Sequence, residues 1–347
     1  MSDSAPAPSF PEILAELSSP AGASPASLHA LFRAILAGTW PPAQVAGALI
    51  ALRLLGETTD TFVAGAKAMR EVMVRVPHEF AVVLDTCGTG GDHSRTLNLS
   101  TGAALIAAGA GVAVAKHGNR AATSQSGSAD VLEALGVALD VPPHAQSGVL
   151  REAGIAFLFA QAHHPAMRNT MPIRRELGVR TILNCLGPLS NPASATHQLI
   201  GTFDDVVRPK IANALVRLGT VRAWVVRSAD GMDELSPHGV TRVSAAANGT
   251  VEEFEVTPED FGLRRSPAGA IAGSDPASNA RALEEVLSGA EHPASDAFVL
   301  NAAAALVVAE GLEPKIAAQR AREVLRSGAA LARLNLLRQA TASAPRG

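Results

Sequence analysis

The sequence contains no tyrosine, and aromatic residues make up only 3% of its 347 residues. Aromatic platforms on which the bases of a single-stranded nucleic acid could stack are therefore scarce. Lysine plus arginine number 29 against 32 for aspartate plus glutamate, which gives a formal net charge of −3 and no basic surplus. We therefore expect no nucleic acid and no membrane among the partners of this chain.

Cysteine is also scarce, because the chain contains only Cys87 and Cys185, which are far apart in the sequence. Two cysteines cannot build a disulfide framework, and by themselves they make no zinc site. We expect two reduced thiols. Cys87 borders a glycine-rich segment, so a reactive role for it is the lesser alternative.

Long hydrophobic runs are missing as well. The longest apolar stretch, residues 103–115, is interrupted by glycines and ends at Lys116, which makes it too short to span a bilayer. Residues 1–9 lack the basic start and apolar core of a signal peptide, and their Pro/Ala-rich composition predicts a disordered tail. We therefore expect a cytoplasmic protein.

The residues that are present suffice for two domains, since 47% of the chain is hydrophobic. In the first part, apolar residues recur at helical spacing with clear start and stop signals. Ser24-Pro25 is an N-cap followed by a first-turn proline, and Gly38 and Gly56 are stop signals. We expect a small bundle of four helices, over residues 11–17, 25–36, 42–55 and 59–73.

After Pro77, short apolar runs alternate with helical patterns. Such alternation predicts a mainly parallel sheet covered by helices. Asn248-Gly249, between two apolar runs, predicts a hairpin turn. The expected strands are residues 81–84, 112–115, 155–159, 198–200 and 223–226. The expected helices are residues 101–108, 129–135, 206–218, 296–310 and 315–325.

A glycine-rich segment, Asp85-Thr-Cys-Gly-Thr-Gly-Gly-Asp92, directly follows the first expected strand. Its glycines allow tight turns that present backbone N–H groups to an anion. The helix that follows Thr96-Leu-Asn-Leu-Ser-Thr101 would add the free N–H groups of its first turn. The segment is neither a Walker A loop nor a GxGxxG fingerprint. The alternative is a plain glycine turn with an ordinary N-cap.

A second polar segment, Lys116-His-Gly-Asn-Arg120, follows the next expected strand and continues through Ala-Ala-Thr-Ser-Gln-Ser-Gly-Ser128 into a helix. Lysine, arginine, hydroxyl groups and a helix N-terminus could together hold phosphate oxygens. Loops at the carboxyl ends of parallel strands are where α/β sheets bind ligands. The alternative is a solvated polar loop.

Two further segments carry charged groups. His163-His164 is followed by several arginines, among them Arg174, but no third residue has the spacing of a zinc ligand. An arginine here could grip a carboxylate with two parallel hydrogen bonds. Asp233-Glu234, on a loop after an expected strand, could hold Mg²⁺ together with substrate phosphates. The alternative for the acidic pair is a solvated turn or a helix start.

These segments, taken in order, resemble one family closely, the anthranilate phosphoribosyltransferases. The family pattern is GTGGD, NxST, KHGNR with a serine-rich run ending SGSAD, HPAM, an arginine before ELGxRT, NxLGPLxNP and a DE pair. All of these occur here in that order between Asp85 and Ser236. Each motif is moderately specific, whereas the ordered set is highly specific. Thr123 stands where members often have serine, and both residues offer a hydroxyl.

The resemblance implies an α/β fold of the nucleoside phosphorylase/phosphoribosyltransferase type, with a small helical domain and a larger α/β domain around a mainly parallel central sheet. The helical domain would comprise residues 10–76 plus about 167–190, and the α/β domain residues 77–166 plus about 191–340. The resemblance also implies a homodimer, a Mg²⁺ cofactor, and transfer of the phosphoribosyl group of phosphoribosyl pyrophosphate to the amine of anthranilate in tryptophan biosynthesis.

The resemblance further implies site residues, none of them a general acid or base. Those for phosphoribosyl pyrophosphate are Gly88, Gly91, Asp92, Thr96, Asn98, Leu99, Ser100, Thr101, Lys116, His117, Gly118, Asn119, Arg120, Thr123, Ser124 and Ser128. Those for anthranilate are Gly88, His117, Asn119, His164, Arg174 and Gly187. Those for the metal are Ser100, Asp233 and Glu234.

Two rival interpretations stay open. A nucleoside phosphorylase of similar fold would use phosphate and a nucleoside, and would not need both a diphosphate–metal site and an arginine clamp for a carboxylate. A non-enzymatic relative that binds nucleic acid would be expected to show a basic stripe and a degraded glycine loop. The net charge of −3 and the intact GTGGD segment weigh against the latter.

Overall fold

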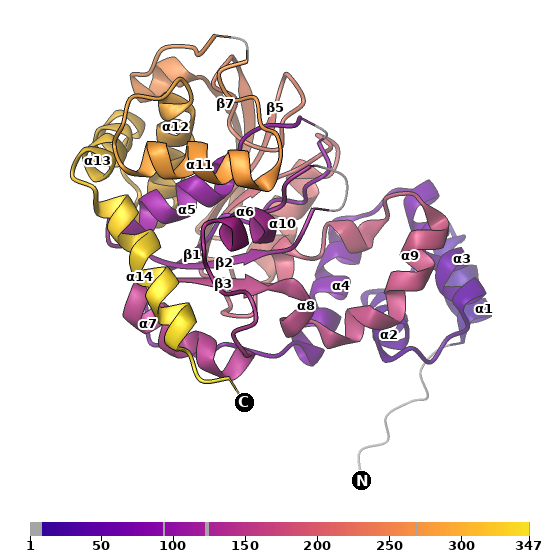
Figure 1. Ribbon diagram of the computed structural model, residues 1–347. Helices are drawn as coiled ribbons and strands as arrows, with labels where there is room; N and C mark the ends of the chain where they lie inside the picture. Colours follow the sequence, from indigo (N-terminus) through magenta and orange to yellow (C-terminus); the bar gives the residue numbers. More distant parts are fainter. Residues whose placement is uncertain (1–8, 93, 122–124, 268, 347) are drawn as a thin grey trace.

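The structure is a computed structural model that describes residues 9–92, 94–121, 125–267 and 269–346. Two lobes are visible, a small all-helical lobe and a larger lobe built around a sheet (Figure 1). Four helices begin the small lobe: α1 (Phe10–Leu17), α2 (Pro25–Ala37), α3 (Pro42–Leu55) and α4 (Thr59–Val72). Ser24 caps α2 by accepting the N–H of Ser27, and Gly38 ends it in the left-handed conformation, as the sequence predicts.

The sheet of the large lobe has seven strands in the order β3-β2-β1-β4-β5-β6-β7. The first five pair in parallel and the last two are antiparallel. Because the strand order reverses direction between β1 and β4, a crevice is expected there at the carboxyl ends of the strands. The strands are β1 (Val83–Asp85), β2 (Ala113–Gly118), β3 (Ile155–Phe159), β4 (His197–Gly201), β5 (Arg222–Ser228), β6 (Thr241–Ala247) and β7 (Thr250–Val256).

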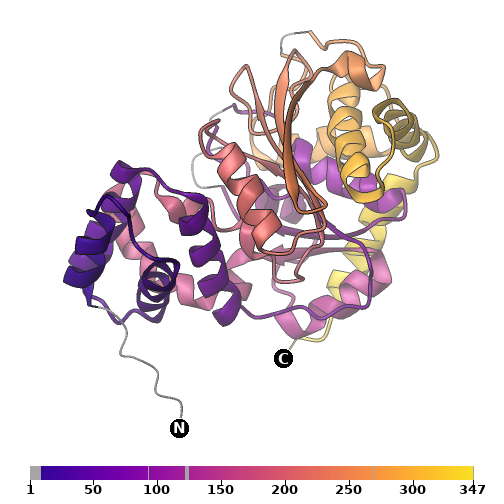
Figure 2. The same cartoon turned by 180° about the vertical axis from the view of Figure 1, so that it is seen from behind.

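Helices cover both faces of this sheet. On one face, α12 contacts β4 and β5 and packs against α5, which in turn packs on α14. On the other face, α10 contacts β5, β6 and β7 and also α4 of the small lobe, so it joins the two lobes (Figure 2). The helices of this lobe are α5 (Leu99–Gly109), α6 (Ser128–Ala134), α7 (Gln146–Ala153), α10 (Arg208–Arg217), α11 (Pro276–Leu287), α12 (Ser295–Glu310), α13 (Pro314–Arg326) and α14 (Ala329–Ser343).

Between β3 and β4 the chain returns to the small lobe. This excursion contains α8 (Ala160–His163) and α9 (Met171–Leu177), and it packs on α2, α3 and α4. Its ends are tied to the chain that leaves α4, since Val74 N–H donates to the His163 carbonyl over 2.8 Å and Val76 N–H to the Pro192 carbonyl over 3.0 Å. Short 3₁₀ turns complete the structure: η1 (Pro143–Ala145), η2 (Pro165–Thr170), η3 (Ile182–Asn184), η4 (Pro188–Ser190) and η5 (Pro258–Phe261).

Most of the expected elements are present with boundaries shifted by a few residues. The hairpin turn has the positive φ angles that a type I′ turn requires, 51° at Asn248 and 80° at Gly249. The tail predicted for residues 1–9 is wrong at Ser9, which is the N-cap of α1 and whose N–H donates to Glu12 Oε2 over 2.7 Å. Residues 1–8 lie outside the described part. Helices α7, α11 and α14 have no counterpart among the expected elements.

In the described ranges, no single helix is long and apolar enough to cross a membrane, and only α12 and α13 taken together, bent by 116°, reach the required length and composition.

Candidate functional site

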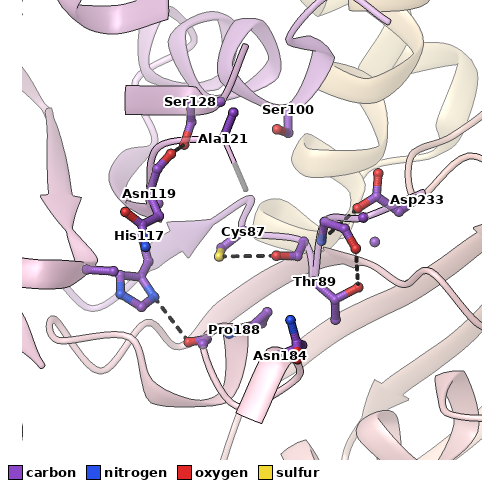
Figure 3. Close-up of a pocket in the computed structure, with 18 of the residues that line it drawn as sticks. Cys87, Thr89, Ser100, His117, Asn119, Ala121, Ser128, Asn184, Pro188 and Asp233 are labelled. Atoms are coloured by element: carbon purple, nitrogen blue, oxygen red, sulfur yellow. Dashed lines mark hydrogen bonds between the residues drawn. The ribbon is translucent and has the colours of Figure 1, made fainter. Parts of the chain in front are cut away.

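A cavity of about 790 Å³ lies between the lobes, at the carboxyl ends of β1, β2, β4 and β5. Figure 3 shows its walls: the glycine loop with Cys87 and Thr89, the end of β2 with His117 and the segment after it with Asn119, and Asp233 on the loop after β5. The small lobe contributes Asn184 and its neighbours from the excursion. The sheet-end crevice is therefore closed on its far side by helices of the small lobe.

The glycine loop is held by backbone contacts to β4 and to the acidic loop. Thr89 N–H donates to the Gly201 carbonyl over 2.8 Å, and Gly90 N–H donates to Asp233 Oδ2 over 3.0 Å. Gly90 and Gly91 have φ angles of 65° and 83°, a region that residues with a Cβ rarely enter. The sequence prediction that these glycines allow an unusual turn is therefore confirmed.

The acidic pair lies directly beside the start of α5. Glu234 Oε1 accepts the Ser100 N–H over 2.9 Å, and Asp92 Oδ2 accepts the Asp233 N–H over 3.3 Å. Three carboxylates therefore gather at one end of the cavity, close to Ser100. More than 130 positions separate Asp92 and Ser100 from the acidic pair in the sequence, and the parallel sheet brings them together.

This carboxylate cluster is electrostatically costly on its own. Burial, followed by the neighbouring Asp92 charge, raises the pKa of Asp233 to about 7. Burial and the charges of Asp233 and Asp92 raise the pKa of Glu234 well above its ordinary value. A divalent cation would remove this penalty, so the donor set fits a hard cation. Within the described ranges, however, no three His, Cys, Asp or Glu residues are grouped so as to hold a metal by themselves.

Lys116 supplies a buried positive charge beside this cluster. Its Nζ donates to the Thr86 carbonyl over 3.2 Å and to Thr86 Oγ1 over 3.1 Å, and lies 3.4 Å from Ser100 Oγ. Burial lowers the pKa of Lys116, while the nearby acidic groups oppose that shift. The segment after β2 differs from the prediction in one respect, because β2 runs on to Gly118 and so includes Lys116 and His117.

Asp85 is a buried anchor whose role the sequence does not reveal. Its Oδ1 accepts the His117 N–H over 3.1 Å, and its Oδ2 accepts Asn191 Nδ2 over 2.7 Å. Asn191 Nδ2 also donates to the Ala115 carbonyl over 2.8 Å. Burial raises the pKa of Asp85 to about 6. In the sequence, the position of this carboxylate as the last residue of an apolar strand is the feature that could have indicated a buried anchor.

Asp130 shapes the entry to α6. Its Oδ2 accepts the N–H groups of Ala121 and Gly127, each over 2.9 Å, which closes the loop after β2 onto the helix start. Arg120 bonds to Asp130 and Glu133 over 2.8–2.9 Å, so it is engaged outside the cavity centre although it lines the wall. Thr123 and Ser124 lie outside the described residues.

The opposite end of the cavity carries two histidines and an arginine. The rings of His117 and His164 are 5.0 Å apart, and His117 Nδ1 lies 3.1 Å from the Gly187 carbonyl oxygen. Burial lowers the pKa of His164 to about 4 and lowers that of His117 well below its ordinary value, so both rings are neutral at pH 7. Arg174 is partly buried, and its side chain has no hydrogen bond or ion pair to a described residue.

Most predicted site residues that the structure describes line this one cavity. Leu99 and Thr101 do not: both are buried within the large lobe, because they lie on the face of α5 that packs against the core. Cys87 borders the cavity, but burial raises the pKa of its thiol well above the ordinary value, which disfavours the reactive alternative. Predicted residues that do line it are Gly88, Gly91, Asp92, Thr96, Asn98, Ser100, Lys116, His117, Gly118, Asn119, Arg120, Ser128, His164, Arg174, Gly187, Asp233 and Glu234.

Arg95 and Asn301 also line the cavity, although the sequence assigns them no role, and so does Arg180, one of the arginines that follow the histidine pair. Arg180 stacks over the Phe203 ring, with its guanidinium carbon 4.4 Å from the ring centre. Asn301 exchanges hydrogen bonds with the backbone of Leu235, accepting its N–H over 3.0 Å, and so fixes the chain just after the acidic pair. An asparagine inside an otherwise apolar helix was the signal for this role.

Comparison with known proteins shows two matches to family models. Residues 81–331 match the glycosyl transferase family a/b domain, and residues 11–73 match the glycosyl transferase family helical bundle domain. Among curated relatives, anthranilate phosphoribosyltransferase of Rubrobacter xylanophilus is 52% identical over 86% of this chain and 88% of its own. The enzyme of that name from Phenylobacterium zucineum is 47% identical over 96% and 98%.

Solved structures agree with these relatives. Anthranilate phosphoribosyltransferase of Thermus thermophilus superposes with a TM-score of 0.87 at 42% identity, covering 92% of this chain and 96% of that one. The enzyme of that name from Saccharomyces cerevisiae, in complex with PRPP and Mg, superposes with a TM-score of 0.88 at 29% identity, covering 96% and 98%.

Proposed function

The chain belongs to the anthranilate phosphoribosyltransferase family, and we propose that it transfers the phosphoribosyl group of phosphoribosyl pyrophosphate to the amine of anthranilate, in tryptophan biosynthesis. One observation carries the proposal beyond family membership. A single cavity has a glycine loop, Lys116 and a carboxylate cluster at one end and, at the other, a partly buried Arg174 with no described acidic partner. The first end suits a diphosphate with a cation, and the second suits a carboxylate.

The donor would lie between the glycine loop and the segment after β2. Backbone N–H groups of the glycine loop, the hydroxyls of Ser100 and Ser128, and Lys116 would contact phosphate oxygens. Glycine at position 118 lets the Ser128 hydroxyl lie close to the end of β2, since a Cβ there would lie 2.4 Å from Ser128 Oγ. Anthranilate would lie between the two histidines and Arg174, whose planar guanidinium can pair with the carboxylate through two hydrogen bonds.

Mg²⁺ is the cofactor that fits the acidic end. Asp233 and Glu234, with the Ser100 hydroxyl, would hold it, and the remaining ligands would come from water and the diphosphate. Bound there, the ion supplies positive charge to the leaving diphosphate. The raised pKa values of both carboxyl groups support this assignment, because they mark a cluster that is disfavoured without a counter-charge.

The chemistry needs position and electrostatics more than a general base. The anomeric C–O bond breaks and pyrophosphate leaves with the electron pair, while the anthranilate nitrogen forms the new C–N bond and releases a proton to water. Lys116 and the backbone N–H groups would stabilise charge on the leaving group. The neutral side chains of His117 and His164 would hold the aromatic ring for attack, and closure of the two lobes around both substrates would exclude competing water.

Two rivals make different predictions. A nucleoside phosphorylase would cleave a nucleoside with inorganic phosphate and would have no use for Arg174. A nucleic-acid-binding relative would bind an oligonucleotide without turnover. We further expect a homodimer and a cytoplasmic location, and light scattering on the purified protein tests the dimer.

The direct test follows anthranilate fluorescence in the presence of purified protein, Mg²⁺ and phosphoribosyl pyrophosphate. We expect fluorescence loss that requires all three components, with stoichiometric release of pyrophosphate. Parallel reactions with nucleosides plus phosphate should show no turnover. Absence of anthranilate consumption at millimolar substrate would overturn the proposal, and nucleoside cleavage would favour the phosphorylase.

A further inference from the structure

Arg95 lies on the segment between the glycine loop and α5 and lines the cavity, with an exposed side chain. The family pattern described above covers residues 88–92 on one side and 98–101 on the other, so it assigns nothing to this position. Its neighbours do belong to the donor end of the cavity, since Asp92 contacts the acidic loop and Ser100 contacts Glu234.

The backbone of Arg95 is held in a conformation that an arginine rarely adopts. Its φ angle is 52°, in the left-handed region. Contacts from a distant segment fix it there: Gly273 N–H donates to the Arg95 carbonyl over 2.8 Å, and Leu97 N–H donates to the Ile271 carbonyl over 2.9 Å. Thr96 forms an isolated antiparallel bridge with Ala272 between them.

The backbone of residues 95–97 packs tightly against that of residues 271–273. A Cβ on Gly273 would lie 2.4 Å from the Thr96 carbonyl oxygen, so only glycine allows the approach. A strained non-glycine residue persists where surrounding contacts over-determine it, and such residues gather at sites that clamp ligands. Glycine or asparagine would fit this backbone more easily than arginine, and neither carries a charge.

No described residue pairs with the positive charge of Arg95. The Arg95 side chain makes no hydrogen bond or ion pair to any described residue. Three other cations at the donor end are engaged: Lys116 with Thr86 and Ser100, Arg120 with acidic residues of α6, and Arg180 with the Phe203 ring. Arg174 comes from α9 at the other end of the cavity. Arg95 is therefore a cation at the phosphate end whose charge no described residue neutralises.

We propose that Arg95 is a further phosphate-binding residue, which pairs with phosphate oxygens of the phosphoribosyl pyrophosphate donor. The inference rests on the proposed function, because that function supplies the ligand. A guanidinium offers paired N–H donors that match two oxygens of one phosphate, which a lysine cannot do. This pairing gives a reason for arginine at a backbone position that it does not favour.

The test compares Arg95→Asn with Arg95→Lys and with Arg264→Asn, an exposed arginine outside the cavity. Asparagine tolerates the left-handed backbone, so Arg95→Asn removes the charge without adding strain. We expect Arg95→Asn to raise both the KM and the calorimetric Kd for phosphoribosyl pyrophosphate by about tenfold, the lower range for a charged hydrogen bond at an exposed site. The KM for anthranilate should stay within about twofold of wild type. Arg95→Lys should fall between Arg95→Asn and wild type, and Arg264→Asn should match wild type.

Two smaller probes locate the contact. Calorimetry with Mg²⁺-pyrophosphate and with ribose 5-phosphate shows which end of the donor Arg95 meets, since weakened binding of either one by Arg95→Asn supports the proposal. Unchanged binding of the donor and of both probes by a folded Arg95→Asn variant would overturn it while leaving the proposed function intact. Failure of the wild-type protein to bind the donor would overturn both.

Discussion

Gly201, the last residue of β4, touches the backbone of Asp233 so closely that a Cβ on this glycine would lie 1.3 Å from the Asp233 carbonyl oxygen. The same aspartate also restricts the glycine loop, since a Cβ on Gly88 would lie 3.1 Å from Asp233 Oδ2. The acidic loop, β4 and the glycine loop are therefore packed backbone against backbone. A change at one of them displaces the other two.

Gly201→Ala should consequently lower activity, although Gly201 has no side chain that could contact a substrate. Its methyl group must push the acidic loop away from the glycine loop, and misplacement by about 1 Å can cost on the order of 100-fold in rate. We expect kcat/KM to fall by at least about that factor, with a stability loss of about 1–3 kcal/mol from overpacking. Steady-state kinetics and urea unfolding measure both quantities.

Gly148→Ala is the matched control for this substitution. Gly148 lies within α7 and has nothing within 4 Å of an added Cβ, so alanine should stabilise the helix by up to about 1 kcal/mol. Its activity should equal that of wild type. Gly201→Ala with full activity would show that the acidic loop tolerates displacement, and would separate it from the reaction.

Arg174→Ala should separate the two substrates. Loss of a charged hydrogen-bond partner costs about 1.5–3 kcal/mol, so the KM for anthranilate should rise by roughly 10- to 150-fold. The KM for phosphoribosyl pyrophosphate should change little, because its groups lie at the other end of the cavity. Arg264→Ala, at an exposed position outside the cavity, serves as the comparison and should leave both KM values unchanged. Equal losses for both substrates in Arg174→Ala would indicate a structural role instead.

The sequence predicts much of this architecture because its signals are local. Capping by Ser24, the turn at Asn248-Gly249 and the apolar run of β3 each depend on residues that are adjacent in the chain. Boundaries fail where pairing decides them: β2 extends through Lys116 and His117 because those residues pair with Phe157 and Leu158 of β3. A polar pair at a strand end resembles a loop unless the neighbouring strand is known.

The site was predictable to the extent that its residues lie in recognisable segments. Leu99 and Thr101 belong to such a segment, yet they face the core, because the helical period turns them away from Ser100. Arg95 carries no local signal, and its position depends on pairing with Gly273. Arg180, in the ELGxRT motif, and Asn301, in an apolar helix, do carry one, but their contacts with Phe203 and Leu235 come from distant parts of the chain. No local pattern in a single sequence carries that information.

His163 should make the protein sensitive to acid. It is fully buried at the junction of the lobes, with Nδ1 2.9 Å from the Val74 carbonyl oxygen, and burial lowers its pKa below 6.5. The folded state therefore resists protonation while the unfolded chain accepts it. The contribution of neutral His163 to the free energy of unfolding is fully present above about pH 6.5. It is lost as pH falls through the lower, folded-state pKa.

His163→Asn keeps a donor near the Nδ1 position and removes the titration. We expect the fall in Tm between pH 7.5 and pH 5 to be smaller in this variant than in wild type, whatever the variant loses at pH 7.5. Groups away from His163 titrate equally in both proteins and cancel, whereas His117 and His164, whose pKa values the His163 charge also lowers, contribute to the measured difference. An identical fall in Tm would show that His163 is not among the groups that confer acid sensitivity.

The acidic pair should couple pH to Mg²⁺. Because the folded-state pKa of Asp233 is raised to about 7 from an ordinary 3.8, the metal-free fold favours the protonated carboxyl. The stability from this group is fully present below about pH 3.8 and is lost progressively as pH rises to about 7, so the metal-free enzyme should become less stable between pH 5 and pH 7. Mg²⁺ needs the ionised carboxylate, so its affinity should rise over the same interval, and its binding should release protons.

The combined Asp233→Asn and Glu234→Gln variant keeps the side-chain shapes and removes both charges. We expect it to show no Mg²⁺ activation and a flatter Tm between pH 5 and pH 7 in the absence of metal. Calorimetry in two buffers of different ionisation enthalpy measures the proton release. Full activation of the double variant by Mg²⁺ would place the metal elsewhere, and an unchanged pH slope would mean that the cluster is already ionised and stabilised in the metal-free fold.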